Sequence, residues 1–203
     1  MTKVFGIGLS RTGSTSLTEA LSSLGYRAIH FPADPITQRE YSDFFDNPSG
    51  TLKLSLLGHY DAITDTPLPR VYRELDRGYP GSKFIWTIRD KESWLKSCEL
   101  WWRRSVIPFM ENDHLEMLRP FMSLVGRVTY GTAGFDAELF SRAHDAHMEE
   151  VSRYFLGRNR DLLPLNICAG HGWLELAPFL GMAVPDGPFP HRNEMIPDPG
   201  CYG

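Results

Sequence analysis

The sequence predicts an α/β fold in which a mostly parallel central sheet is covered by helices on both faces. Short apolar stretches alternate with helical segments along the chain, and strands that are buried on both faces have this apolar character. The strongest stretch, residues 83–88 (KFIWTI), is rich in β-branched and aromatic residues. The chain has 203 residues and no Pro/Gly/Ser-rich linker that would divide it, so we expect residues 1–203 to form a single domain.

Five apolar stretches are expected to form the strands. They are short and end at polar or Gly-rich segments, as strands of a parallel sheet do. The last stretch contains Pro164, which cannot donate a hydrogen bond to a neighbouring strand and is therefore expected at the edge of the sheet. The expected strands are residues 4–8, 26–30, 61–64, 83–88 and 162–167.

Helices are expected between and after these strands. Gly25 is a typical residue at a helix C-terminus, and Pro67 and Pro69 are typical of a helix start. The expected helices cover residues 16–24, 52–57, 69–77, 91–106, 115–125, 136–156 and 173–180. Residues 31–50, with three prolines, are expected to form a loop, and the Pro- and Gly-rich tail from residue 185 is expected to lie as an extended surface strap.

Composition and charge exclude several classes of protein. With 42% hydrophobic and 23% charged residues the chain is globular rather than disordered. We expect neither a secretory signal nor a membrane span, because no apolar run approaches about 18 residues. The net charge of −4 argues against a nucleic-acid binder. Three cysteines, Cys98, Cys168 and Cys201, are too few for a disulfide framework or a zinc finger, so a reducing, cytoplasmic setting is expected.

The basic residues are unevenly divided, with 16 Arg and 5 Lys. Guanidinium groups suit bidentate contact with phosphate or sulfate oxygens. A coding bias would produce the same ratio, so the excess of arginine gains meaning only where an arginine falls within a motif.

Residues 8–15 (GLSRTGST) have the character of a phosphate-binding loop. They follow an expected strand and precede an expected helix, so backbone N–H groups and the positive helix end would converge on an anion. The spacing matches the G-x-x-x-x-G of a nucleotide-binding P-loop, but Ser14 stands where such loops carry lysine, and Arg11 is the nearby cation. Transfer of a γ-phosphoryl group usually needs that lysine, so ATP chemistry is disfavoured. A plain Gly/Ser turn is the structural alternative.

A second signal lies at the end of the strongest strand. Arg89 comes directly after this strand, and Ser93 and Ser97 follow four residues apart on one face of the next helix. Ligands of open parallel sheets bind beyond the carboxyl ends of the strands, where both Arg89 and the loop at residues 8–15 are expected. Arg89 with these hydroxyls would hold a second phosphate; the alternative is a surface pair of Arg89 and Asp90 with solvated serines.

Together the two signals resemble the sulfotransferases that use 3′-phosphoadenosine-5′-phosphosulfate (PAPS). That family has a strand–loop–helix of the type P-K-S-G-T-T for the 5′-phosphosulfate, and residues 10–15 fill this pattern. It also has an Arg at a strand end with a Ser eight residues later for the 3′-phosphate, which is the spacing of Arg89 and Ser97. The stretches GLSRTGSTSL, DTP (65–67), TIRDKESW (87–94) and FPHRN (189–193) look closest to a compact, mostly microbial branch.

This resemblance implies a P-loop-type three-layer sandwich with a helical insertion, expected at residues 105–158, that would choose the acceptor. It implies transfer of a sulfuryl group from PAPS to a hydroxyl, less readily an amine, of a small molecule. Adenosine 3′,5′-bisphosphate would be the product, and no metal would be required. The residues expected to bind PAPS are Ser10, Arg11, Thr12, Gly13, Ser14, Thr15, Ser16, Arg89, Ser97 and Arg192.

Arg11, Asp65 and His30 are the expected catalytic residues. Arg11 would stabilise the negative charge that builds on the leaving oxygen. Asp65 and His30 follow the third and second expected strands, where either is placed to accept the proton of the acceptor. The family uses a histidine in some branches and a carboxylate in others, and we favour Asp65. The structural alternatives are a helix N-cap for Asp65 and an ordinary half-buried histidine for His30.

Two other functions stay open: an ATP-dependent small-molecule kinase, and a nucleotide-binding protein without catalysis. Homo-oligomers are compatible with the sequence. His144 and His147 are expected on a polar helix face rather than in a metal site. Trp94, Trp101 and Trp102 are expected either in the core or in an acceptor pocket.

Overall fold

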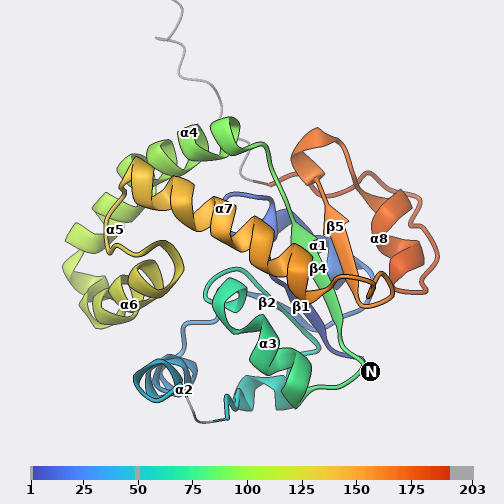
Figure 1. Cartoon of the computed structure of the whole chain (residues 1–203), viewed down its shortest axis with the longest axis horizontal. Helices are drawn as coiled ribbons and strands as arrows, with labels where there is room; N and C mark the ends of the chain where they lie inside the picture. Colours follow the sequence, from blue (N-terminus) through green and yellow to red (C-terminus); the bar gives the residue numbers. More distant parts are fainter. Residues whose placement is uncertain (1, 49–50, 193–203) are drawn as a thin grey trace, which may run out of the picture.

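The computed structural model describes residues 2–48 and 51–192, and its centre is one parallel sheet (Figure 1). The strand order is β2-β3-β1-β4-β5, and all four neighbouring pairs run parallel. The strands are β1 (Val4–Gly6), β2 (Ala28–His30), β3 (Ala62–Thr64), β4 (Lys83–Thr87) and β5 (Leu162–Leu165). The α/β class and the parallel sheet are therefore confirmed.

The last strand, β5, lies at one edge of the sheet and pairs only with β4 in that order. Its Pro164 stands opposite Trp86 in the register. Proline lacks an N–H donor, and an edge strand can contain it because one side of that strand has no hydrogen-bonding neighbour. The edge position predicted from Pro164 is confirmed.

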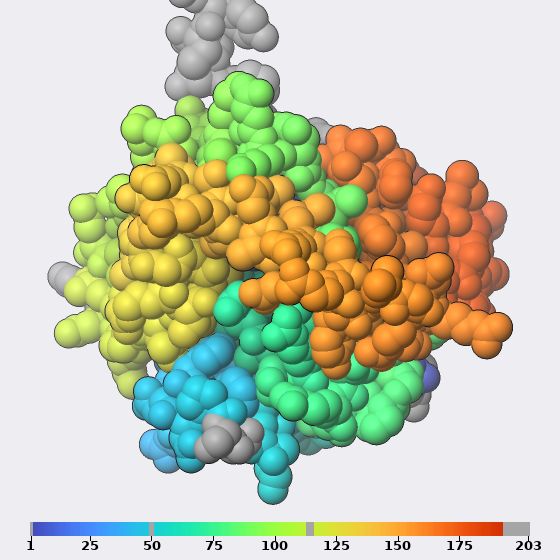
Figure 2. Space-filling model, viewed as in Figure 1, coloured from blue at the N-terminus to red at the C-terminus, as the bar shows by residue number. Residues whose placement is uncertain are grey.

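Helices cover both faces and give the predicted three layers. They are α1 (Ser14–Ser23), α2 (Pro35–Asp46), α3 (Leu68–Gly78), α4 (Lys91–Trp101), α5 (Ile107–Glu111), α6 (Arg119–Tyr130), α7 (Ala137–Tyr154) and α8 (Trp173–Phe179). One face packs on α1 and α8, with Val4, Leu17 and Leu176 in its core. The other face packs on α3 and α7, with Phe5 and Val151 in its core. Figure 2 shows α7 lying across the near face above α3.

Residues 31–50 were expected to be a loop, and this expectation is wrong. Helix α2 begins at Pro35, directly after its N-cap Asp34, whose Oδ1 accepts hydrogen bonds from the N–H groups of Ile36 and Thr37, each at 3.1 Å. Proline at the first position of a helix does not break it, because that N–H has no partner within the helix. The reverse error occurs at residues 52–57, where the expected helix is reduced to a single 3₁₀ turn at Ser55–Gly58.

Residues 102–154 are helical over most of their length; α5 and α6 lie beside the sheet, and α7 runs from them across one of its faces (Figure 1). Helix α4 runs into a π-helical turn at Trp102–Val106, which α5 follows, and a 3₁₀ turn at Asp113–Leu118 precedes α6. π-Turns within helices occur frequently at functional sites. This helical group is the insertion that was expected at residues 105–158, with α6 displaced toward the C-terminus from the expected 115–125.

The expectation of a polar helix face at His144 and His147 is wrong, because both side chains are buried against the core. His144 packs on Trp94 with ring centroids 5.0 Å apart. The Nε2–H of His147 donates to the carbonyl of Ile7 at 2.9 Å, and burial lowers the pKa of His147 to about 4. A neutral histidine therefore supports the end of β1 from α7.

The described part of the tail packs over α8 without regular secondary structure. The indole N–H of Trp173 donates to the carbonyl of Gly187 at 2.9 Å, and Phe189 packs edge-on against the Trp173 ring. This arrangement agrees with an extended strap as far as residue 192, whereas Cys201 lies outside the described residues. Across the described ranges, none of the helices combines the length and the apolar character that crossing a membrane requires.

Candidate active site

The loop at residues 8–13 leaves β1 and opens α1, and two glycines permit its path. A Cβ atom at Gly8 would collide with the side chain and the carbonyl of Thr87, so the loop passes too close to the end of β4 for any other residue. Gly13 has φ +105°, and a Cβ there would lie 3.1 Å from Ile167 Cδ1. Helix α1 then begins at Ser14, earlier than expected, with its first backbone N–H groups facing the loop.

Ser10 is fixed within this loop by three hydrogen bonds. Its N–H donates to the hydroxyl of Tyr130 at 3.2 Å, and its carbonyl accepts from the indole N–H of Trp94 at 2.8 Å. Its hydroxyl donates to Asp65 Oδ1 at 2.9 Å. The loop is therefore held by α4, α6 and the segment after β3, which are distant from it in sequence.

Arg11 and Arg89 meet at the carboxyl end of the sheet, as the two sequence signals predicted. Arg89 Nη1 donates to the carbonyl of Arg11 at 3.2 Å and Arg89 Nε donates to the hydroxyl of Ser93 at 3.2 Å. Arg11 Nε donates to the hydroxyl of Ser97 at 3.3 Å, so Ser97 contacts Arg11 rather than Arg89. Burial lowers the pKa of Arg11, and the neighbouring charge of Arg89 acts in the same direction. Because guanidinium groups stay protonated in proteins, an anion between them would relieve this repulsion.

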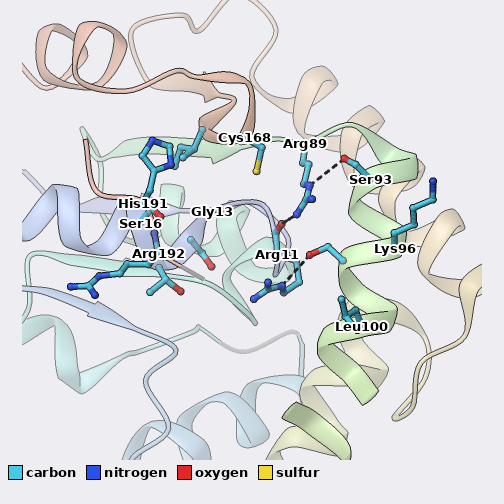
Figure 3. A pocket seen from close by; sticks show the side chains of 14 residues that line it. Arg11, Gly13, Ser16, Arg89, Ser93, Lys96, Leu100, Cys168, His191 and Arg192 are labelled. Atoms are coloured by element: carbon cyan, nitrogen blue, oxygen red, sulfur yellow. Dashed lines mark hydrogen bonds between the residues drawn. The ribbon is translucent and has the colours of Figure 1, made fainter. Parts of the chain in front are cut away.

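A cavity of about 620 Å³, which we call the larger cavity, opens above the loop and beside α4 (Figure 3). Its basic lining residues come from the loop, the end of β4, α4 and the tail. Figure 3 shows Arg11 and Arg89 beside the α4 residues, with His191 and Arg192 on the opposite side. The residues that line it are Arg11, Gly13, Ser14, Thr15, Ser16, Arg89, Ser93, Lys96, Ser97, Leu100, Ile167, Cys168, His191 and Arg192.

Most of the residues expected to bind PAPS line this larger cavity, and Thr12 and Ser10 are the exceptions. The Thr12 hydroxyl donates to the carbonyl of Leu9 at 2.6 Å and lies 2.7 Å from the hydroxyl of Thr87, so it braces the loop. Arg192 lines the rim, where its N–H donates to the hydroxyl of Ser16 at 2.9 Å and its Nε pairs with Glu19.

Sequence reasoning missed Lys96 as a lining residue. Lys96 lies one helical turn after Ser93 on the same face of α4, and that spacing was the available signal. Its ammonium group is paired with Glu92 at 2.8 Å and is exposed, so it offers a movable charge at the rim.

A second cavity of about 170 Å³, the smaller cavity, lies on the other side of the loop. Trp101 and Trp102 line this cavity, whereas Trp94 is fully buried in the core. The three tryptophans, which were expected either in the core or in an acceptor pocket, are therefore divided between the core and this cavity. The residues that line it are Ser10, His30, Phe31, Asp65, Thr66, Trp101, Trp102, Met122, Val125, Gly126 and Tyr130.

The two candidate bases, Asp65 and His30, are in contact at the polar end of the smaller cavity. His30 Nε2 lies 3.3 Å from Asp65 Oδ2 and 3.2 Å from the hydroxyl of Ser14, which lines the larger cavity. The polar wall between the cavities is thus formed by Ser10, Arg11, Ser14 and this pair. Helix α3 has Pro67 as its N-cap and no side-chain cap, so the alternative of Asp65 as a helix cap is wrong.

Backbone strain is concentrated around these two cavities. Outside glycine, positive φ angles in the described residues occur at Arg11 (70°), Phe31 (42°) and Asp65 (77°). Each of the three lines one of the cavities. Left-handed conformations cost free energy in residues with a side chain and cluster at functional sites. The strained residues therefore lie in the same region as the candidate site residues.

Groups of three or more His, Cys, Asp or Glu side chains that could hold a metal ion are not found in residues 2–48 and 51–192. Cys98 is buried in a cluster with Leu9, Trp94 and Phe140, and burial raises the pKa of its thiol, which suits a packing role.

Comparisons with known proteins show the fold and the family. The fold is similar to the crystal structure of a sulfotransferase from Alicyclobacillus acidocaldarius, with a TM-score of 0.57, 14% identity, and coverage of 97% of this chain and 87% of that one. In sequence the chain is 29% identical over 212 residues to the Ava biosynthesis cluster protein M of Aspergillus versicolor, covering 93% of this chain and 80% of that protein. A family model described as a sulfotransferase domain matches residues 3–195. The chain belongs to this sulfotransferase family.

Proposed function

We propose that this protein transfers a sulfuryl group from PAPS to a hydroxyl, less readily an amine, of a small-molecule acceptor. The observation that carries the proposal is the meeting of Arg11 and Arg89 in one cavity over the loop at residues 8–15. Membership of the sulfotransferase family supports sulfuryl rather than phosphoryl transfer. Residues 1–203 would act as a single domain with donor and acceptor on opposite sides of the loop.

The larger cavity fits a donor with two separate anionic groups. The N–H groups at the start of α1, with Ser14 and Thr15, would hold the 5′-phosphosulfate beside Arg11. Arg89, Ser93 and Lys96 would surround the 3′-phosphate.

The tail supplies the opposite wall of the larger cavity, where His191 and Arg192 would contact the adenosine portion. Ser16 stands where cytosolic members of the family have a tryptophan that stacks on the adenine. In this protein a different residue would have to contact the adenine ring. The N–H of Arg192 already donates to the hydroxyl of Ser16, which fixes this stretch of the tail above α1.

When bound, PAPS supplies an activated sulfuryl group, which passes in line to the acceptor oxygen as the bond to the bridging phosphate oxygen breaks. Arg11 is placed to stabilise the negative charge on that leaving oxygen. The proton of the acceptor hydroxyl goes to Asp65, which lies at the polar end of the smaller cavity with unused lone pairs on both carboxylate oxygens. His30, against Asp65 Oδ2, holds this carboxylate in place and is the second candidate base.

A thermal-shift comparison separates this proposal from the kinase alternative. Adenosine 3′,5′-bisphosphate without metal should raise the melting temperature of the protein, because a ligand stabilises the state that it binds. Stabilisation by Mg–ATP alone would instead support a kinase. Stabilisation by the bisphosphate without sulfation of any acceptor would support a nucleotide-binding protein without catalysis.

The assignment of Arg89 to the 3′-phosphate is tested by Arg89→Ala. We expect the Kd for the bisphosphate to rise about 100-fold, which corresponds to the loss of a charged hydrogen-bonded pair. Arg103→Ala is the matched control, because Arg103 follows α4, is exposed and pairs only with Glu99 among the ion pairs described. Equal Kd values for the two variants, measured by calorimetry, would refute the assignment.

A further inference from the structure

The smaller cavity carries information about the acceptor. We propose, building on the function proposed above, that the acceptor is a small, uncharged aromatic alcohol with one ring. Its hydroxyl would lie at the Asp65 end, and its ring would lie between the aromatic side chains of α4 and α6.

The volume of the smaller cavity, which is open on one side, favours an acceptor with one ring. The smaller cavity measures about 170 Å³, and a protein cavity of about 150 Å³ is known to hold one benzene molecule. One substituted ring therefore fills this space, whereas a fused two-ring system would have to extend through the open side of the cavity or displace its walls. Met122 is the flexible wall residue whose shortening would create that room.

The walls suit a flat ring. Phe31, Trp101, Trp102 and Tyr130 contribute four aromatic side chains, and the two indole rings meet edge to face at 5.8 Å and 86°. The Tyr130 ring is fixed by stacking on Phe140 at 4.1 Å and 10°. Rigid aromatic walls favour an aromatic guest through offset-stacked and edge-to-face contacts. Apolar walls also disfavour a polyol, whose additional hydroxyls would lose their hydrogen bonds to water.

Charge excludes acidic acceptors. The ionisable residues of the smaller cavity are Asp65, His30 and Tyr130, and neither lysine nor arginine is among its lining residues. His30 is already placed against Asp65. An acceptor carboxylate would therefore lie beside the carboxylate of Asp65, with neither lysine nor arginine among the lining residues to pair with it, which is unfavourable.

The test measures sulfation of matched acceptors by purified protein with PAPS. We expect benzyl alcohol to exceed cyclohexylmethanol about tenfold in kcat/KM, because the two hydroxyl groups have similar acidity and the compounds differ in the ring. We expect 3-hydroxybenzamide to exceed 3-hydroxybenzoate by at least about tenfold, because these compounds differ only in charge. The preference for 4-methylphenol over 2-naphthol should also be about tenfold or more.

Two variants test the size limit directly. Met122→Ala should raise kcat/KM for 2-naphthol relative to 4-methylphenol by about tenfold, since it opens the wall of the cavity. Met117→Ala is the matched control, because Met117 is 85% exposed and does not line the cavity, and it should leave the ratio unchanged.

The outcomes are distinguishable from a failure of the proposed function. Wild-type preference for the alicyclic, anionic or two-ring compound would overturn the acceptor class while sulfuryl transfer stands. If the bisphosphate binds but none of these acceptors is sulfated, quenching of tryptophan fluorescence shows whether 4-methylphenol binds in the smaller cavity, because Trp101 and Trp102 line it. The absence of quenching then overturns the acceptor class, and the absence of bisphosphate binding would instead count against the donor.

Discussion

The two cavities differ in how the chain builds them. The larger cavity is lined mainly by two short stretches of sequence, residues 11–16 in the loop and the start of α1 and residues 89–97, each of which closely follows a strand of the sheet. The smaller cavity is lined by side chains at or directly after the ends of β2 and β3, by Ser10 of the loop, and by others from α4, the π-turn and α6. A donor that many enzymes share can be held by a local sequence motif. An acceptor site assembled from distant elements can then change in sequence without disturbing the donor site.

The two cavities share a wall, and this wall brings their contents close together. Ser10 lines the smaller cavity and its neighbour Arg11 lines the larger one, while Ser14 reaches His30 across the wall. A group held in the larger cavity at Arg11 therefore lies next to a hydroxyl held in the smaller cavity at Asp65. The predictions below act on one side of this wall at a time.

The largest effect on catalysis is expected from substitution of Arg11, which lines the larger cavity. Arg11→Ala should lower kcat about 10³-fold, because it removes the cation that stabilises the leaving oxygen. Arg11→Lys is the matched variant and should retain more activity than alanine, because it restores a charge without the planar fork. Steady-state kinetics with saturating PAPS measures both, and an alanine variant with more than about a tenth of the wild-type kcat would contradict the role of Arg11.

In the smaller cavity, Asp65→Asn should lower kcat about 10²–10³-fold, because the amide cannot take up the proton that the acceptor hydroxyl loses. The backbone should be preserved, since asparagine tolerates the left-handed conformation that Asp65 adopts at φ 77°. Calorimetry should give an unchanged Kd for the bisphosphate. Full activity of this variant would move the role of base to His30, and His30→Gln should then show the loss.

The loop itself is tested by Gly8→Ala. The added Cβ would collide with Thr87, so we expect the free energy of unfolding to fall by about 1–3 kcal/mol. Gly58→Ala is the matched control, because no atom lies within 4 Å of a Cβ at Gly58. Urea unfolding of both variants measures the effect, and equal stabilities would show that the loop is not held against β4 as described.

A smaller, pH-dependent effect is expected at His147, which joins the helical group to the end of β1. Its pKa of about 4 in the folded protein lies below the value of about 6.5 for an unfolded histidine. The unfolded state therefore binds more protons, and stability is lost as the pH falls from the unfolded towards the folded pKa. Between pH 7.5 and pH 5 this group contributes a loss of about 2 kcal/mol.

Urea unfolding of the wild type and of His147→Gln at both pH values isolates this contribution from that of the carboxylates. Glutamine keeps an N–H donor for the Ile7 carbonyl but does not titrate. The difference between the two proteins should therefore change with pH, and a constant difference would show that His147 is not buried in its neutral form.

The sequence predicted the larger cavity better than the smaller one for a physical reason. A glycine-rich loop between a strand and a helix, and an arginine at the end of a parallel strand, each carry a local signal, and parallel topology places both at one edge of the sheet. Tyr130 and Met122 carry no such signal, because their roles depend on how α6 packs. The contact of Asp65 with His30 likewise arises only when β2 and β3 pair.

The errors in the fold have equally specific causes. Pro35 was interpreted as a helix breaker, but Asp34 before it caps a helix that buries Tyr41 and Phe44. His144 and His147 were assigned to a polar face by residue type, but hydrogen bonding and ring packing make buried histidine acceptable. In both cases tertiary contacts outweighed the local pattern.

Transfer of label from the donor to an acceptor tests the central claim most directly. Purified protein is incubated with 4-methylphenol and either ³⁵S-labelled PAPS without metal or γ-³²P-labelled Mg–ATP. The account predicts labelled aryl sulfate in amounts equal to the adenosine 3′,5′-bisphosphate released, and no labelled aryl phosphate. Labelled aryl phosphate without aryl sulfate would contradict it.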